Sequence, residues 1–169
     1  MSKKRIALIS ALVLVAGVAV VATVGSLRST KVAEVTRHTT ATRQQIWQLW
    51  ADVPKRTRWD SGLEYAKIDG PFEAGATGEV KLKGESATRF EVIECTPLES
   101  YTDRFFLPLG GTMDWRHSIK EVPGGLEVTF RIEVRGLSSL PVSLIASSIL
   151  EGELPGTVDS LVAVAEKQS

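Results

Sequence analysis

The sequence predicts an α+β fold in which an antiparallel β-sheet wraps around a long C-terminal helix, preceded by an N-terminal transmembrane helix. Three observations lead to this prediction. Residues 126–135 alternate apolar and polar side chains, residues 140–167 carry apolar side chains at helical spacing, and residues 6–27 form an uncharged apolar run. Alternation with period two is typical of a strand with one buried face, whereas spacings of three and four are typical of a helix.

The apolar run is the first element of the chain and extends over 22 residues, from Ile6 to Leu27. As a helix it would be about 33 Å long, enough to cross a hydrocarbon core of about 30 Å. We therefore expect residues 1–28 to anchor a single-pass membrane protein. The alternative is a signal peptide cleaved near Val20-Val21-Ala22, although the run is longer than the usual signal core. The basic start, Lys3-Lys4-Arg5, favours an N-terminus inside the cell and a domain outside the cytoplasm.

A domain over residues 31–167 follows, beginning with a strand and two short helical segments. Lys31–Thr39 is rich in Val and Thr and alternates weakly, which indicates a strand. Hydroxyl side chains at 39–42 can cap a helix over 43–50, whose apolar residues fall on one face. Pro54 ends that helix and can start a second helical turn.

Six further strands are expected, separated by turns rich in Gly and Pro. Their ranges are 63–68, 79–83, 88–95, 101–107, 112–121 and 126–135. Short connections between consecutive strands predict an antiparallel meander, whose apolar face needs a cover. The segment 140–167 is the only element long enough to provide it, and Pro155-Gly156 within that segment predicts a kink or two collinear helical pieces.

The charge pattern argues against nucleic-acid binding. The chain has 20 basic and 20 acidic residues, but three of the basic ones precede the apolar run. The part after residue 27 therefore holds 17 basic against 20 acidic side chains, a net charge of −3. A mildly acidic domain lacks the clustered Lys and Arg that grip phosphates, so we expect no nucleic-acid partner.

Metal ligands and cofactor motifs are scarce. Cys95 is the only cysteine, and His38 and His117 are the only histidines. A disulfide within the chain is impossible, and a structural zinc site is close to excluded. The sequence contains no HExxH, P-loop, dinucleotide fingerprint or Ser-His-Asp spacing. We expect neither a metal nor a cofactor.

Short strings in the domain match a known family. They are WDSGLEY (59–65), DGPF (69–72), GATG (75–78), ATRF (87–90), GTMDWRH (111–117) and GGLEVT (124–129). Together with the order of elements, they resemble the polyketide cyclase/dehydrase and lipid-transport family, part of the SRPBCC (START and Bet v 1-like) superfamily. The resemblance covers about residues 31–167 and implies a helix-grip fold. It implies no catalytic residues, because members of the family bind or transform very different apolar molecules.

The resemblance also implies a ligand cavity between the concave sheet and the long helix. Strand alternation and helical spacing then propose its lining: Val80, Leu82, Phe90, Val92, Met113, Trp115, His117, Val128, Phe130 and Ile132 on strands, and Leu144, Ile145, Ser148 and Ile149 on the helix. An apolar pocket with few polar groups suits lipids, sterol-like molecules or polyketide-derived molecules. The alternative is that these side chains simply fill the core.

His117 is the polar candidate for catalysis. If it faces inward beside Trp115, its imidazole can act as a general acid or base in an apolar pocket. Tyr101, Asp103 and Arg104 on the preceding strand could orient it. The alternative is a hydrogen-bonded, inert histidine at the rim of the sheet.

Two functional hypotheses follow, and a third remains open. The first is a membrane-tethered carrier domain for a hydrophobic, lipid- or polyketide-like small molecule, held at the membrane by residues 6–27. The second is an aromatase/cyclase-type enzyme that folds a polyketide-like substrate in the same cavity, with His117 as acid or base. The third is a membrane-tethered interaction module with a filled core.

Overall fold

The described part of the chain contains a sheet and a long helix in the predicted order. The computed structural model describes residues 29–136 and 139–168, and their side chains apart from Leu109 and residues 139–151. The elements are β1 (Ser29–Thr39), α2 (Arg43–Ala51), η1 (Val53–Arg58), β2 (Leu63–Asp69), β3 (Thr77–Leu82), β4 (Thr88–Thr96), β5 (Ser100–Leu107), η2 (Pro108–Gly110), β6 (Gly111–Val122), β7 (Gly125–Arg135) and α3 (Ser139–Glu166). The predicted succession of strand, two short helices, six strands and long helix is confirmed.

The predicted transmembrane segment, residues 6–27, lies outside the described residues. Within residues 29–136 and 139–168, no helix is both long and apolar enough to span a bilayer. The membrane anchor therefore stays a prediction from the sequence.

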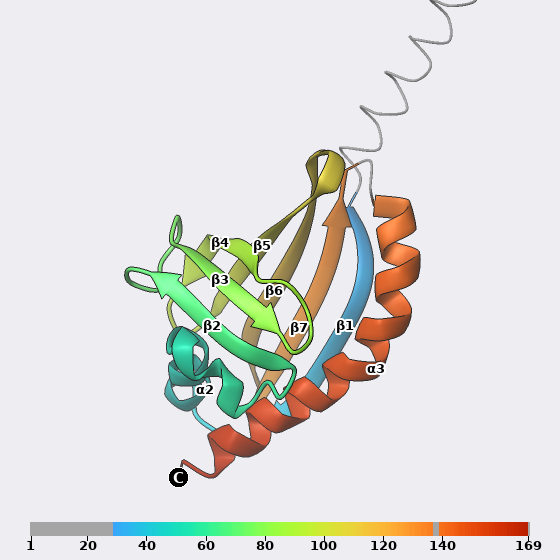
Figure 1. The fold of residues 1–169 in the computed structure, drawn as a ribbon. Coiled ribbons are helices and arrows are strands. Elements are labelled where there is room, and N and C mark those ends of the chain that lie inside the picture. Colours follow the sequence, from blue (N-terminus) through green and yellow to red (C-terminus); the bar gives the residue numbers. More distant parts are fainter. Residues whose placement is uncertain (1–28, 137–138, 169) are drawn as a thin grey trace, which may run out of the picture.

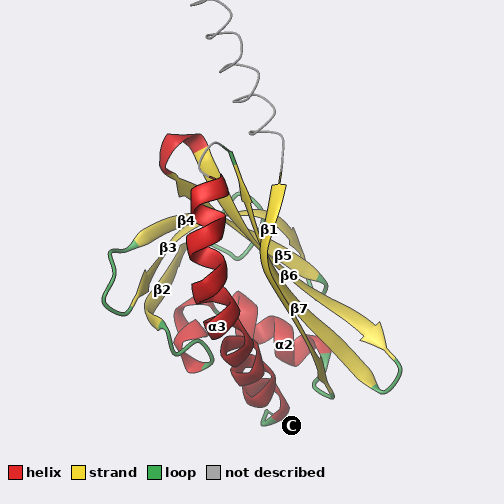
Figure 2. Cartoon of the chain, turned by 90° about the vertical axis from the view of Figure 1, so that its right-hand side faces the viewer, coloured by secondary structure: helices red, strands yellow, loops and turns green. Residues whose placement is uncertain are grey.

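The strands form one antiparallel sheet in the order β1-β7-β6-β5-β4-β3-β2. The first strand pairs with the last, and the remaining strands follow one another as a meander. Figure 1 shows that the sheet is strongly curved, with β2–β4 in front of β5–β7. In Figure 2, α3 lies between β2–β4 on one side and β1 with β5–β7 on the other. The helix thus covers the concave face, as the helix-grip prediction required.

The short helix α2 forms where the hydroxyl side chains predict it. Thr42 is its N-cap: the Thr42 side chain accepts a hydrogen bond from the backbone N–H of Gln45, and the Gln45 side chain accepts one from that of Thr42. This capping box satisfies two donors that a helix start leaves unpaired. The buried face of α2 carries Ile46, Leu49 and Trp50, so the helix closes one end of the curved sheet.

The C-terminal element is a single helix that contains Pro155. Proline removes one backbone hydrogen bond and crowds the preceding turn, and Figure 1 shows that the course of α3 bends. Beyond the bend, Leu154, Val158, Leu161 and Ala165 are buried at helical spacing. This stripe packs the second half of α3 against the main hydrophobic core.

The interior contains two hydrophobic clusters rather than one. The main cluster joins α2, β1, β6, β7 and the second half of α3, around Trp50, Val128 and Leu161. A smaller cluster lies under β2 and β4 and comprises Val53, Leu63, Ala66, Phe90 and Val92. Some residues that the sequence analysis predicts to line a cavity therefore pack in these two clusters instead.

Candidate functional site

A cavity of about 670 Å³ lies on the concave side of the sheet. Its wall is built from η1 and the turn after it, from β2 to β7, and from the middle of α3. The lining residues are Arg56, Trp59, Asp60, Ser61, Gly62, Leu63, Val80, Leu82, Glu85, Thr88, Tyr101, Asp103, Phe105, Phe106, Leu107, Met113, Trp115, His117, Phe130, Glu153, Leu154, Gly156 and Thr157. This volume lies within the range of small-molecule sites, about 300–1,000 Å³. The described side chains leave this space open, in contrast to the third hypothesis.

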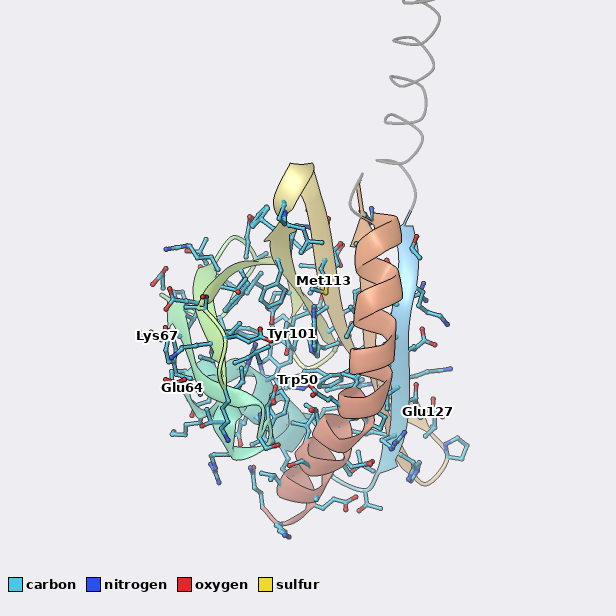
Figure 3. All side chains as sticks on the ribbon, turned by 45° about the vertical axis from the view of Figure 1, so that its right-hand side comes forward. Trp50, Glu64, Lys67, Tyr101, Met113 and Glu127 are labelled. Atoms are coloured by element: carbon cyan, nitrogen blue, oxygen red, sulfur yellow. The ribbon has the colours of Figure 1, made fainter. Side chains whose placement is uncertain are left out.

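The structure brings eight of the residues singled out from the sequence to this wall. They are Val80, Leu82, Met113, Trp115, His117, Phe130, Tyr101 and Asp103. Figure 3 shows Tyr101 and Met113 inside the domain, between α3 and the strands, whereas Glu64, Lys67 and Glu127 point outward. Strand parity therefore assigns the inward face correctly.

Phe90 and Val92 face inward but do not line the cavity. Both belong to the smaller cluster, where Phe90 covers Gly78 so closely that a Cβ on the glycine would lie 2.4 Å from its ring. On β7, Val128 and Ile132 are fully buried in the main cluster, which also contains residues of α3. Alternation predicts which face a residue occupies, but the neighbours that cover it come from distant parts of the chain.

The predicted helix lining cannot be compared with the structure, because the side chains of Leu144, Ile145, Ser148 and Ile149 lie outside its described part. Their place in the lining stays a prediction. The described helical wall is supplied by Glu153, Leu154, Gly156 and Thr157. No local pattern marks these positions, because the side of α3 that faces the cavity depends on how the helix bends over the sheet.

Three aromatic side chains form a ladder across the middle of the sheet. Tyr101 on β5 lies opposite His117 on β6, which lies opposite Phe130 on β7. The rings of Tyr101 and His117 stack, with centroids 4.1 Å apart and 3° between their planes. The Phe130 ring meets the His117 ring edge-on at 4.3 Å. Such cross-strand aromatic pairs stabilise the sheet and fix ring orientation.

His117 is a buried, neutral imidazole rather than a rim residue. Burial, and secondarily the positive charge of Arg56, lower the pKa of His117 well below its ordinary value. Its Nδ1 atom has no hydrogen-bond partner. At neutral pH the imidazole is therefore uncharged. It can accept a proton or donate one hydrogen bond, but it does not carry the additional proton that a general acid would donate.

Asp103 does not orient His117, because it is paired with another residue. Its Oδ2 accepts a hydrogen bond from Nη1 of Arg56 at 2.9 Å, and both side chains are buried. Burial raises the pKa of Asp103, and the Arg56 charge opposes that rise. Arg104 also has a different role from the one expected, since it forms a two-bond pair with Asp114.

Arg56 is the main residue that the sequence analysis missed. It lies in the run VPKRTR, between Lys55 and Arg58, where nothing in the sequence marks one basic residue as buried. The 3₁₀ turn of η1 directs it inward, and its Nε donates to the backbone oxygen of Trp50 at 3.1 Å. Its guanidinium lies 5.2 Å from the centre of the Tyr101 ring and 5.4 Å from that of Phe72, a cation–π arrangement.

Four polar atoms in this region are buried without a hydrogen-bond partner. They are Nη2 of Arg56, the hydroxyl of Tyr101, Oδ1 of Asp103 and Nδ1 of His117. All four residues line the cavity. Unpaired buried polar atoms are rare because each costs desolvation energy, so these four side chains form a polar region in the cavity wall.

The mouth of the cavity carries exposed apolar side chains. Phe106 is 59% exposed and Leu82 is 41% exposed, the two large apolar residues with this exposure among the described side chains. Both line the cavity. Phe106 shares one cross-strand row with the first described residue of the chain: Phe106, Thr112, Arg135 and Ser29 pair in succession across β5, β6, β7 and β1.

The described side chains offer no metal centre. No group of three or more His, Cys, Asp or Glu among them is arranged to hold a metal ion. Two carboxylates of the cavity wall have other partners: Asp103 pairs with Arg56, and Asp60 accepts a hydrogen bond from the backbone N–H of Gly62 at 3.0 Å.

Comparison with known proteins agrees with this architecture. The family model described as polyketide cyclase/dehydrase and lipid transport matches residues 30–166. The chain belongs to this family. The match to the polyketide cyclase/dehydrase and lipid-transport family extends from β1 to the end of α3. All described residues of the cavity wall therefore lie within the matched part of the chain. No curated protein is similar to the chain at a significant level.

Solved structures share the family fold at low sequence identity. Protein MLL2253 from Mesorhizobium loti has a TM-score of 0.65 and 14% identity, with 84% of this chain and 99% of that chain covered. Ara h 8.0201 has a TM-score of 0.66 and 9% identity, covering 83% and 99%. The di-domain ARO/CYC StfQ from the steffimycin biosynthetic pathway has a TM-score of 0.64 and 15% identity, covering 83% of this chain and 51% of StfQ. At these identities the likeness establishes the fold.

Proposed function

We propose that this protein binds and carries a hydrophobic small molecule, of lipid-like or polyketide-like character, at a membrane surface. The observation that carries the proposal is the cavity of about 670 Å³ between the sheet and α3. The cavity opens to solvent at its mouth, where Leu82 and Phe106 are exposed. A ligand that enters it would remove apolar surface of the wall from water, which is favourable.

The character of the wall favours an apolar ligand body. Trp59, Leu63, Phe105, Met113 and Leu154 present rings and aliphatic groups to the cavity. Transfer of an apolar molecule from water to such a wall is favourable by about 25 cal/mol per Å² of buried apolar surface. The polar atoms of Arg56, Asp103, Tyr101 and His117 are confined to one region of it.

The proposed membrane tether fits the position of the cavity mouth. The apolar run 6–27 ends two residues before β1. Because neighbouring strands are about 4.8 Å apart, the row from Ser29 to Phe106 spans about 14 Å. A chain that leaves the bilayer at residue 28 would hold the exposed Phe106 ring close to the membrane surface. The ligand would then pass between bilayer and cavity over a short path.

Mass spectrometry of molecules extracted from the purified full chain tests the carrier proposal. The matched variants are Thr157→Trp, which adds a large ring to the half-buried helical wall of the cavity, and Ala163→Trp, which adds the same ring to an exposed position of the same helix. We expect an apolar molecule to accompany the parent and Ala163→Trp chains but to be lost from Thr157→Trp. Equal recovery from all three proteins would show that the molecule is bound elsewhere.

An aromatase/cyclase-type enzyme is the second candidate, and one observation favours it. The neutral His117 ring is held rigidly between Tyr101 and Phe130 at the cavity wall, and StfQ shares the fold. A shaped pocket can promote cyclisation largely by positioning a flexible chain. His117→Phe preserves the ring stack but removes the imidazole. Cyclisation of a polyketide-like substrate that falls at least tenfold in this variant would support catalysis, whereas unchanged turnover would exclude a role for His117.

A further inference from the structure

We propose that Arg56, Asp103, Tyr101 and His117 form a polar subsite that binds an uncharged oxygen group, a hydroxyl or a carbonyl, on the otherwise apolar ligand. This inference rests on the proposed carrier function and specifies its ligand further. We refer to these four residues as the polar subsite.

The polar subsite is one contiguous cluster. Arg56 and Asp103 form the 2.9 Å ion pair, the Arg56 guanidinium lies over the Tyr101 ring, and the Tyr101 ring stacks on that of His117. All four side chains are at least nine-tenths buried and line the same cavity. Each therefore has one polar atom that bulk water does not reach and that no protein group satisfies.

The unpaired atoms offer both donors and acceptors. Nη2 of Arg56 can only donate and Oδ1 of Asp103 can only accept, whereas the Tyr101 hydroxyl can do both. Nδ1 of a neutral histidine accepts or donates according to its tautomer. A hydroxyl group has the same dual character, and a carbonyl group can accept from Arg56 and Tyr101. Either group can therefore pair with atoms of this set.

The charges of the polar subsite argue against an anionic ligand group. Arg56 and Asp103 neutralise one another, and burial keeps Tyr101 and His117 uncharged because it raises the pKa of the phenol and lowers that of the imidazole. A carboxylate or phosphate would therefore meet no net positive charge, and its oxygens would face Oδ1 of Asp103. Desolvation of a charged group without a compensating partner is strongly unfavourable.

A fluorescence titration with three probes on one scaffold tests the inference. Pyrene, 1-hydroxypyrene and pyrene-1-carboxylate differ only in the oxygen group. The full chain is held in lipid nanodiscs, and nanodiscs without protein give the partition of each probe into lipid. We expect 1-hydroxypyrene to bind about tenfold more tightly than pyrene, the ratio that one to two well-placed hydrogen bonds supply. Pyrene-1-carboxylate should bind no more tightly than pyrene.

The two tyrosines of the chain provide a matched pair of variants. Tyr101→Phe removes the unpaired hydroxyl and keeps the ring, whereas Tyr65→Phe removes a hydroxyl that donates to Glu79 outside the cavity. We expect Tyr101→Phe to bring the ratio of hydroxypyrene to pyrene affinity close to one without changing pyrene affinity. It should also leave the unliganded protein at least as stable, because it removes an unsatisfied polar atom. Tyr65→Phe should keep the parent ratio.

Two results would overturn the inference while leaving the carrier proposal intact. One is pyrene binding with an affinity ratio that Tyr101→Phe does not change, and the other is tightest binding of the carboxylate. If none of the three probes binds to the protein above the nanodisc background, the carrier proposal itself fails and the polar subsite falls with it.

Discussion

Arg56 and Asp103 form an ion pair inside the domain although 47 residues separate them: Nη1 and Oδ2 are 2.9 Å apart, and only 6% and 4% of the two side chains are exposed. The pair connects η1 to the middle of β5, and thereby fixes the short helical segment over the end of the sheet. Because both groups are desolvated, each depends on the other.

Breaking this pair from one side should cost more stability than removing it entirely. Arg56→Met leaves a buried Asp103 without its partner and should lower the free energy of unfolding by about 3–5 kcal/mol. The double variant Arg56→Met/Asp103→Leu should recover most of that loss, because no charge then remains buried. Chemical denaturation measures all the variants. If the double variant loses as much unfolding free energy as Arg56→Met and Asp103→Leu lose together, the two residues contribute to stability independently.

The stability of the protein should fall as the pH decreases below about 6.5, the ordinary pKa of histidine. The lowered pKa of His117 means that the unfolded state binds a proton at a higher pH than the folded state does. Stability is therefore lost in the window below the unfolded pKa, by at most about 1.4 kcal/mol per pH unit. His117→Phe should remove this contribution, so the unfolding free energy of the parent minus that of the variant should decrease as the pH falls from 7.5 to 5. A constant difference would mean that His117 titrates alike in both states.

Two glycines should respond oppositely to alanine. At Gly78 an added Cβ would lie 2.4 Å from the backbone oxygen of Lys67 and from the Phe90 ring, so Gly78→Ala should destabilise the protein by about 2–3 kcal/mol. At Gly156, within α3, the added atom meets nothing within 4 Å, and Gly156→Ala should stabilise it by up to about 1 kcal/mol. Thermal unfolding distinguishes the two. A Gly78→Ala variant that unfolds at the same temperature as the parent would contradict the close packing of Phe90 against Gly78.

If the proposed tether is correct, Phe106 should lie at the membrane surface. In a Cys95→Ser background, Phe106→Cys and Val122→Cys each accept one polarity-sensitive fluorophore. Val122 ends β6, whereas Thr112, the partner of Phe106, is near its start, so the two labels report opposite ends of the sheet. When the full chain is reconstituted in vesicles, we expect the emission maximum of the label at position 106 to shift to the blue by about 20–40 nm, because the label is partly buried at the interface. The emission maximum of the label at position 122 should stay at its value in water. Aqueous emission at both positions would place the cavity mouth away from the bilayer.

The order of elements could be predicted from the sequence because each element has a local signal. The alternation of 126–135 and the hydroxyl cap before the helix 43–50 are visible within a few residues, and both are confirmed. The inward face of β6, with Met113, Trp115 and His117, follows from the same period. Local patterning was sufficient for these features since side-chain direction along a strand is fixed by the backbone.

The composition of the candidate site could not be predicted to the same degree, because it depends on contacts between distant segments. Val128 and Ile132 have the correct parity, but both are fully buried in the main cluster, to which α2 and α3 contribute residues. Arg56 appears in the sequence as one of several basic residues of η1, and only Asp103 and the Tyr101 ring, contributed by β5, explain its burial. Both outcomes arise from tertiary packing, which overrides the local pattern.

A crystal structure of the protein grown in the presence of 1-hydroxypyrene would show whether the cavity holds an apolar ligand. We expect electron density for the probe in the cavity, in contact with Met113 on the sheet side and Thr157 on α3, with its hydroxyl towards Tyr101. A structure in which α3 and the surrounding side chains close that space, with no room for the probe, would contradict this expectation.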